Sequence, residues 1–224
     1  MSVSTIFRIL KKIGYSHHGV HYRNPKQKEN LPETLDFMEE ISKLLPRQIL
    51  ATDESGYPLN LAPKKRWGPK GKKITRFKKH YSPNYTLILL IHNVENKGII
   101  HWDLKEGAVD TEIFTNFVNN IKLSDNEKYY LLLDRLPVHK AKKVIEALNN
   151  KNIEPRLIVS ANPWLNPTEE VFHVIKQYVE KQEPRTYEVL KATVAEKINE
   201  LQKESLTKYF KDCLDFDFIL KSGH

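Results

Sequence analysis

The chain has 224 residues, of which 40% are hydrophobic, and this is enough to build one sizeable core. No apolar stretch approaches the roughly 20 residues that cross a bilayer, and the N-terminus lacks a signal-peptide pattern, so we expect a cytoplasmic or nuclear location and no membrane partner. The single cysteine, Cys213, excludes an internal disulfide and a cysteine-cluster zinc site.

The net charge of +8 is concentrated in two segments. Residues 1–28 contain six Lys or Arg and no acid, and residues 64–79 contain nine and no acid. Lysine runs are often solvated loops, but interleaved aromatic residues add stacking surfaces to phosphate neutralisation and favour nucleic-acid binding. The candidate DNA-binding residues are Arg8, Lys11, Lys12, Lys64, Lys65, Arg66, Trp67, Lys70, Lys72, Lys73 and Arg76.

In the first half of the chain, helical spacing of apolar residues predicts a short basic helix closed by Gly14. A connecting helix follows in "LPETLDFMEEISKLLP", and "QILATD" predicts a short strand that ends at Asp53 and is broken by Gly56. Beyond the second basic segment, "YTLILLIHNV" and "KGIIHWDL" predict two strands joined by a turn.

In the second half, "DTEIFTNFVNNI" predicts a helix capped by Asp110, and "YYLLLD" predicts a buried strand. A helix, a strand in "EPRLIV", a helix in "NPTEEVFHVIKQYVEK" and two helices near 187–202 and 205–214 complete the chain. This order predicts an α/β protein with a ribonuclease H-like fold: a mixed five-stranded sheet flanked by helices, with helical N-terminal and C-terminal extensions.

Three carboxylates fall at element boundaries of this predicted fold. Asp53 ends the first strand and Asp134 ends the fourth, and these two strands would be neighbours. Glu169 lies on the first turn of the helix after the fifth strand. Clustered carboxylates repel one another, and a divalent cation such as Mg²⁺ relieves that repulsion while leaving positions open for phosphate and water.

Each acid also has a local alternative. Asp53 could start a turn, and Asp134 could pair with Arg135 or cap the next helix. Glu169 fits a capping box with Asn166 as N-cap, and Glu170 on the same turn is a rival for its role.

Together, "DESGYPLNLAPKKRWGPKGKK", "LLLDRLPVHK" and "LNPTEEVFHVIK" resemble the three blocks of the mariner-like DDE transposase superfamily, most closely its bacterial insertion-sequence branch. Between Asp134 and Glu169 lie 34 residues, a spacing typical of that family. The resemblance covers about residues 1–185.

The resemblance implies that Asp53, Asp134 and Glu169 are the catalytic, metal-binding residues, holding two Mg²⁺ (or Mn²⁺) ions per active site. His139 is then expected to make a supporting polar contact, beside Asn166 and Glu170. The implied reaction is strand cleavage at transposon ends followed by strand transfer into target DNA. Double-stranded DNA is the implied partner, with a homodimer expected.

The resemblance also implies a division into domains. Residues 1–28 would be a remnant of a helix-turn-helix DNA-binding domain, 29–48 a linker helix, 49–185 the ribonuclease H-like catalytic domain and 186–224 a C-terminal helical extension. Relatives carry a longer front, so a separate upstream-frame DNA-binding chain is a further expected partner. Arg135 replaces the usual Asn, which leaves open a catalytically inactive or domesticated DNA-binding remnant and, more distantly, a general nuclease of this fold.

Overall fold

The computed structural model describes residues 2–15, 25–61, 83–96, 98–124 and 126–214. Its strands are β1 (Ile49–Pro58), β2 (Asn84–His92), β3 (Ile99–Glu106), β4 (Tyr129–Leu133) and β5 (Ile153–Leu157). They form one sheet in the order β3-β2-β1-β4-β5. The pairs β1–β2 and β2–β3 are antiparallel, and β1–β4 and β4–β5 are parallel. The predicted mixed five-stranded sheet is confirmed.

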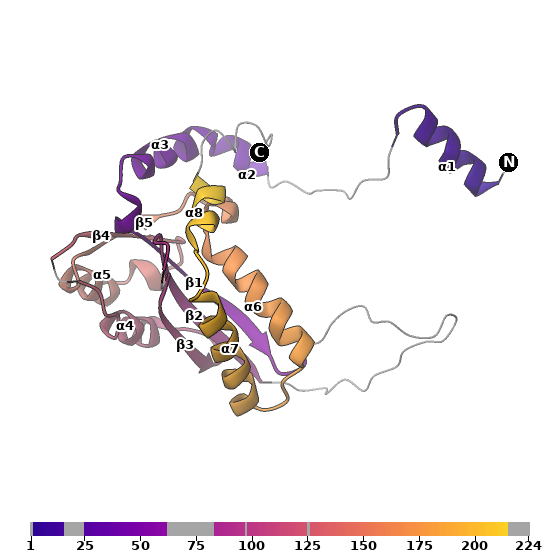
Figure 1. The fold of residues 1–224 in the computed structure, drawn as a ribbon. Coiled ribbons are helices and arrows are strands. Elements are labelled where there is room, and N and C mark those ends of the chain that lie inside the picture. The colour runs from indigo at the N-terminus through magenta and orange to yellow at the C-terminus, as the bar shows by residue number, and fades with distance from the viewer. Residues whose placement is uncertain (1, 16–24, 62–82, 97, 125, 215–224) are drawn as a thin grey trace.

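Helices cover both faces of this sheet, with α4 and α5 on one face and α6 and α7 on the other (Figure 1). The α-helices of the described residues are α1 (Val3–Lys12), α2 (Pro25–Glu29), α3 (Leu31–Ser42), α4 (Thr111–Asn119), α5 (Lys142–Asn150), α6 (Thr168–Gln182), α7 (Tyr187–Leu201) and α8 (Thr207–Leu214). The predicted caps form, since the Asp110 side chain accepts the N–H of Ile113 at 2.8 Å and Gly14 takes a positive φ of 84° after α1.

The pleat of the strands divides the buried side chains into two layers. On β1, Leu50 packs in the cluster beneath α4 and α5, whereas Ala51 packs in the cluster beneath α6 and α7. On β4, Leu132 faces the same side as Ala51. Because side chains alternate along a strand, the layer that any residue of β1 or β4 faces follows from these positions.

The prediction that Gly56 breaks the first strand is wrong. β1 continues to Pro58 because it pairs with β2 along that whole length, with Gly56 opposite Thr86 and Pro58 opposite Asn84. A Cβ on Gly56 would lie 3.3 Å from the Asn84 side chain, so the glycine serves a close approach between strands here. Asp53 therefore lies within a strand and does not start a turn.

The connecting segment and the C-terminal helices pack on the α6 side of the sheet. Phe37, Met38 and Ile41 of α3 join the same core cluster as Leu190 of α7 and Phe210 of α8. The helices predicted before the first strand and after the fifth strand are therefore confirmed.

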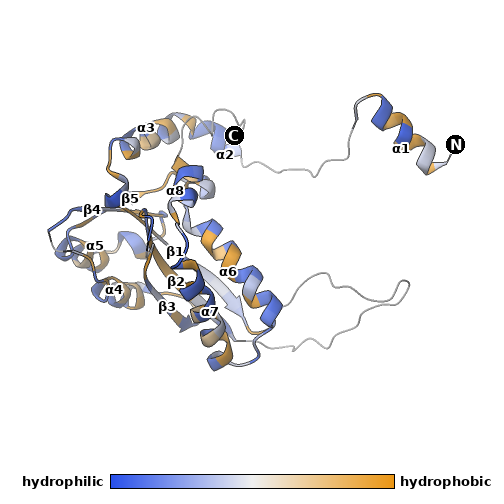
Figure 2. Ribbon diagram, viewed as in Figure 1, coloured by the Kyte–Doolittle hydropathy of each residue, from blue (hydrophilic) through white to orange (hydrophobic). Residues whose placement is uncertain are grey.

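α1 differs from the other long helices because none of its residues is buried. Hydrophobic and hydrophilic residues are interspersed along α1 (Figure 2), and the apolar Phe7 is 51% exposed. Within the described ranges, no helix combines the length and apolar character needed to span a membrane.

Candidate active site

The two aspartates lie side by side because β1 and β4 are parallel neighbours. Leu50 pairs with Leu131 and Ala51 with Leu132. The same register, extended by two residues, places Asp134 opposite Asp53 just beyond the end of β4. Both positions share the strand face of Ala51 and Leu132, which is the face covered by α6.

Glu169, on the first turn of α6, completes a pocket with these aspartates. A pocket of about 340 Å³ is lined by Asp53, Asp134, Arg135, Leu136, Ile158, Val159, Ser160, Ala161, Asn162, Pro163, Asn166 and Glu169. Glu170 does not line it and instead borders a second hollow with His173 and Lys176, which Glu169 lines as well. The structure thus brings Asp53, Asp134 and Glu169 to one pocket and turns Glu170 elsewhere.

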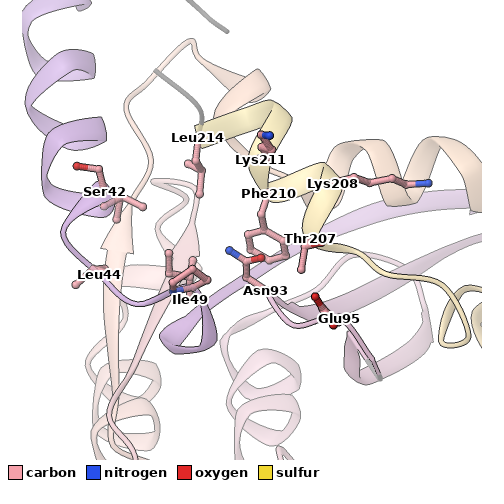
Figure 3. Close-up of a pocket in the computed structure, with 12 residues that line it drawn as sticks. Ser42, Leu44, Ile49, Asn93, Glu95, Thr207, Lys208, Phe210, Lys211 and Leu214 are labelled. Carbon is pink, nitrogen blue, oxygen red and sulfur yellow. The ribbon is translucent and has the colours of Figure 1, made fainter. Parts of the chain in front are cut away.

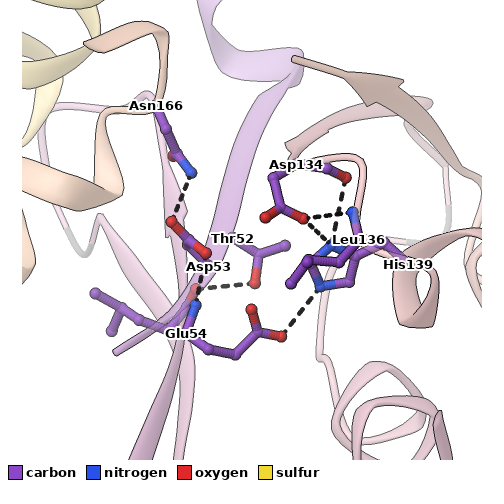
Figure 4. Close-up of polar contacts among 8 residues, drawn as sticks. Thr52, Asp53, Glu54, Asp134, Leu136, His139 and Asn166 are labelled. Atoms are coloured by element: carbon purple, nitrogen blue, oxygen red, sulfur yellow. Dashed lines mark hydrogen bonds and ion pairs between the residues drawn. The ribbon is translucent and has the colours of Figure 1, made fainter. Parts of the chain in front are cut away.

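Asp53 is held by two hydrogen bonds and surrounded by other acids. Its Oδ1 accepts the backbone N–H of Glu54 at 2.8 Å, and its Oδ2 accepts the Asn166 amide at 3.0 Å (Figure 4). Burial raises the pKa of Asp53 to about 7, and the nearby charges of Glu54, Glu169 and Asp134 act in the same direction. The position favours a neutral carboxyl unless a cation compensates its charge.

Asp134 is held from the other side by a histidine. Its Oδ1 accepts the N–H of Leu136 at 3.0 Å and lies 2.7 Å from Nδ1 of His139. His139 is fully buried, and its Nε2 lies 3.1 Å from Oε1 of Glu54. Burial opposes protonation of this ring, but the hydrogen bonds to Asp134 and Glu54 outweigh it and raise the pKa of His139 to about 10. Despite its partial burial, the His139 contact leaves the pKa of Asp134 below its usual value.

The capping box that Asn166 and Glu169 could have formed, the local alternative for Glu169, is absent at the start of α6. The helix begins at Thr168, and Asn166 accepts the Thr168 N–H at 3.2 Å and its hydroxyl at 2.6 Å while donating to Asp53. Asn166 is thus a link between the start of α6 and the first aspartate. The carboxylate of Glu169 is left to line the pocket.

The oxygen-rich lining suits a hard divalent cation such as Mg²⁺ or Mn²⁺, which prefers carboxylate ligands. Across the described part of the chain, no three His, Cys, Asp or Glu side chains are already arranged to hold one ion. The carboxylates line a common pocket, but Asp53 is bound to Asn166 and Asp134 to His139. The residues fit such a cation in chemistry and location, and ion binding would require their side chains to draw together.

The Arg135 side chain pairs with an acid of α3, although the sequence also allowed a pair with Asp134. Its guanidinium forms an ion pair with Glu33 of α3, and its Nε donates to the Ile158 carbonyl at 3.1 Å. It pairs with Glu33 and not with Asp134. Two more hydrogen bonds join the α2–α3 segment to the β5–α6 loop. The Gln27 amide donates to the Ala161 carbonyl and the Asn30 amide donates to the Ser160 carbonyl, each at 2.9 Å.

The predicted DNA-binding residues fall into two groups. Arg8, Lys11 and Lys12 are exposed on α1. The remaining eight, Lys64, Lys65, Arg66, Trp67, Lys70, Lys72, Lys73 and Arg76, lie outside the described residues.

A larger pocket of about 680 Å³ lies away from the carboxylates, between α3, the start of β1 and α8 (Figure 3). Its lining includes Leu44, Ile49 and Phe210, with Lys208 and Lys211 from α8. None of the predicted catalytic residues lines it, so its size does not indicate the site of chemistry.

Glu54 is the residue that sequence reasoning missed. It follows Asp53 directly, and alternation along a strand would have placed it on the opposite sheet face, but its contact with His139 spans 85 positions and has no local signal.

The part of the chain that holds this pocket is similar to a known protein family. A family model described as DDE superfamily endonuclease matches residues 48–191, which is more than half of the chain. No curated protein sequence matches the chain.

Solved structures of Mos1 mariner transposase are similar to the chain along most of its length. The paired end complex with Mn matches with a TM-score of 0.78 and 17% identity, covering 99% of this chain and 70% of that one. A pre-cleavage Mos1 transpososome gives a TM-score of 0.79 at 18% identity, covering 99% and 71%. The isolated Mos1 catalytic domain gives 0.65 at 17%, covering 88% and 93%. At this level of identity the likeness establishes a shared fold.

Proposed function

Since this chain belongs to the DDE superfamily endonucleases, we propose that it is the catalytic subunit of a transposase, which cleaves DNA at transposon ends and joins them to target DNA. The single observation that carries the proposal is the pocket shared by Asp53, Asp134 and Glu169. The similarity to Mos1 paired end and strand transfer complexes supports the same reaction class.

Asp53, Asp134 and Glu169 would hold the divalent ions, two Mg²⁺ or Mn²⁺ per site. When bound, such ions activate the attacking oxygen and stabilise the leaving oxygen of a phosphodiester. Three neighbouring elements would supply the ligands, because Asp53 lies in β1, Asp134 directly follows β4 and Glu169 lies on the first turn of α6. Asn166 and His139 orient the aspartates through the contacts at 3.0 and 2.7 Å.

Double-stranded DNA would enter along the open side of this pocket. The basic residues of α1 and of residues 64–79 would neutralise its phosphates. We assign residues 1–28 to DNA binding, 29–48 to a linker, 49–185 to catalysis and 186–224 to a helical extension. A homodimer would bring two ends together, and a separate upstream-frame chain would add end recognition.

Metal-dependent nicking tests the proposal. The substrate is a supercoiled plasmid carrying the DNA that flanks the coding sequence. The reaction contains either Mg²⁺ or Mn²⁺, and EDTA replaces the metal in the blank. Wild type should nick it, and Asp134→Asn and Glu169→Gln should not. Glu170→Gln is the matched control, because Glu170 lies on the same helical turn outside the pocket, and it should retain activity.

Two outcomes would contradict the proposal. If wild type and Asp134→Asn nick to the same extent, the activity does not come from this pocket. If no metal supports nicking while the protein still binds the flanking DNA, the chain is a catalytically inactive DNA-binding relative of the family.

A further inference from the structure

Glu54 does not line the candidate metal pocket, but it contacts His139, which contacts Asp134 of that pocket. It is next to Asp53 in sequence but on the opposite face of β1, where His139 and Phe114 of α4 lie. Its side chain is only 12% exposed. A carboxylate buried to this degree lowers stability unless it is paired.

The contact made by Glu54 is specific but incomplete. Oε1 lies 3.1 Å from Nε2 of His139, whereas Oε2 is buried and has no hydrogen-bond partner within the described residues. A purely structural role would be served as well by an apolar side chain of similar size. Within the described residues, the one hydrogen bond of the Glu54 side chain is with the ring that holds Asp134.

His139 links Glu54 to the pocket, because it contacts both Glu54 and Asp134. Its Nδ1 meets Oδ1 of Asp134 at 2.7 Å, and Oδ1 also accepts the Leu136 N–H. In Figure 4 the other oxygen of Asp134 points away from His139 and toward Asp53. One oxygen is therefore anchored on the protein side, and the other is presented to the pocket. The Phe114 ring packs against the imidazole, with the two ring centroids 4.6 Å apart.

We propose that Glu54 is a positioning residue for the metal site, which fixes the orientation of His139 so that Asp134 presents one oxygen to the divalent ion. The inference rests on the proposed function, because it takes Asp134 as a metal ligand. Partners of this kind, one contact removed from the metal, commonly contribute about 10- to 100-fold in metal affinity. Glu54 does not itself contact the ion or the DNA.

Mn²⁺ binding to the DNA-free protein tests the proposal without relying on catalysis. Free Mn²⁺ is followed by its electron paramagnetic resonance signal during titration, with Asp134→Ala as the baseline for unspecific binding. Glu54→Leu should weaken Mn²⁺ binding about 10-fold or more. Glu54→Gln should stay within about threefold of wild type, because its amide still provides a hydrogen-bonding group at the Nε2 of His139.

Phe114→Leu is the matched control for simple loosening of the core around the histidine. It removes ring packing and leaves the Glu54–His139–Asp134 contacts in place. Urea unfolding in EDTA reports the stability of every variant. We expect Phe114→Leu to lose stability with Mn²⁺ affinity changed less than threefold, and Glu54→Leu to lose Mn²⁺ affinity beyond any change in stability.

The outcomes separate this inference from the proposed function. If Glu54→Leu binds Mn²⁺ as wild type does while Asp134→Ala does not, Glu54 has no positioning role and the inference is overturned. If Asp134→Ala binds Mn²⁺ as tightly as wild type, the pocket is not the metal site, and the proposed function falls together with the inference. If Glu54→Leu and Phe114→Leu weaken binding equally, the role of Glu54 is packing alone, which also overturns it.

Discussion

The raised pKa of Asp53 makes a quantitative prediction for the metal-free protein. The carboxyl has an ordinary pKa of 3.8 and a folded-state value of about 7, so the folded protein binds a proton more tightly than the unfolded chain between those values. Stability is therefore lost as the pH rises through this window. At about 1.4 kcal/mol per pH unit, the full loss is about 4 kcal/mol, and roughly half of it falls between pH 5.5 and 8.5.

Asp53→Asn removes this dependence because an amide does not ionise. Urea unfolding of wild type and Asp53→Asn in EDTA, at pH 5.5 and 8.5, gives the difference in free energy of unfolding at each pH. We expect the variant to gain about 2 kcal/mol relative to wild type between the two pH values. Effects of the substitution that do not depend on pH cancel in this comparison.

Asp36→Asn is the control, because Asp36 is exposed on α3 and does not line the pocket. Its difference from wild type should change by less than about 0.5 kcal/mol between the two pH values. Adding Mg²⁺ at pH 8.5 should then stabilise wild type and leave Asp53→Asn nearly unchanged, since the ion replaces the proton as the compensating charge. A difference for Asp53→Asn that is equal at pH 5.5 and 8.5 would refute the reasoning.

Two further substitutions and one labelling reaction test other contacts of the described structure. Arg135→Asn removes a half-exposed ion pair with Glu33, so it should lower the free energy of unfolding in urea by less than about 1 kcal/mol. It should also preserve metal-dependent nicking, and a large loss of nicking would show that the arginine has its own role in the reaction. Gly98→Ala should destabilise by about 1–3 kcal/mol in the same unfolding assay, because a Cβ there would lie 2.8 Å from Leu206, and an unchanged midpoint would mean that this contact relaxes freely. Burial raises the pKa of the Cys213 thiol to about 12, so iodoacetamide at pH 8 should label it only in urea, and rapid labelling of the native protein would show that α8 is not packed as described.

Local patterns in the sequence determined the elements and the acids of the site. The apolar run before Asp134 predicted a buried strand, and helical spacing together with Asp110 predicted α4, because burial periodicity and capping act over a few residues. The placement of Asp53 and Asp134 on adjacent strands followed from element order alone, and the observed register agrees with it.

Only the tertiary structure decided how these acids are held. β1 runs past Gly56 because β2 is available to pair with it, and Asn166 serves Asp53 in place of a capping box because α6 begins beside β1. The link from Glu54 through His139 to Asp134 joins residues 85 positions apart. Such contacts depend on which strands and helices become neighbours and on which side of the pleat each residue lies, and a short window of sequence carries neither kind of information.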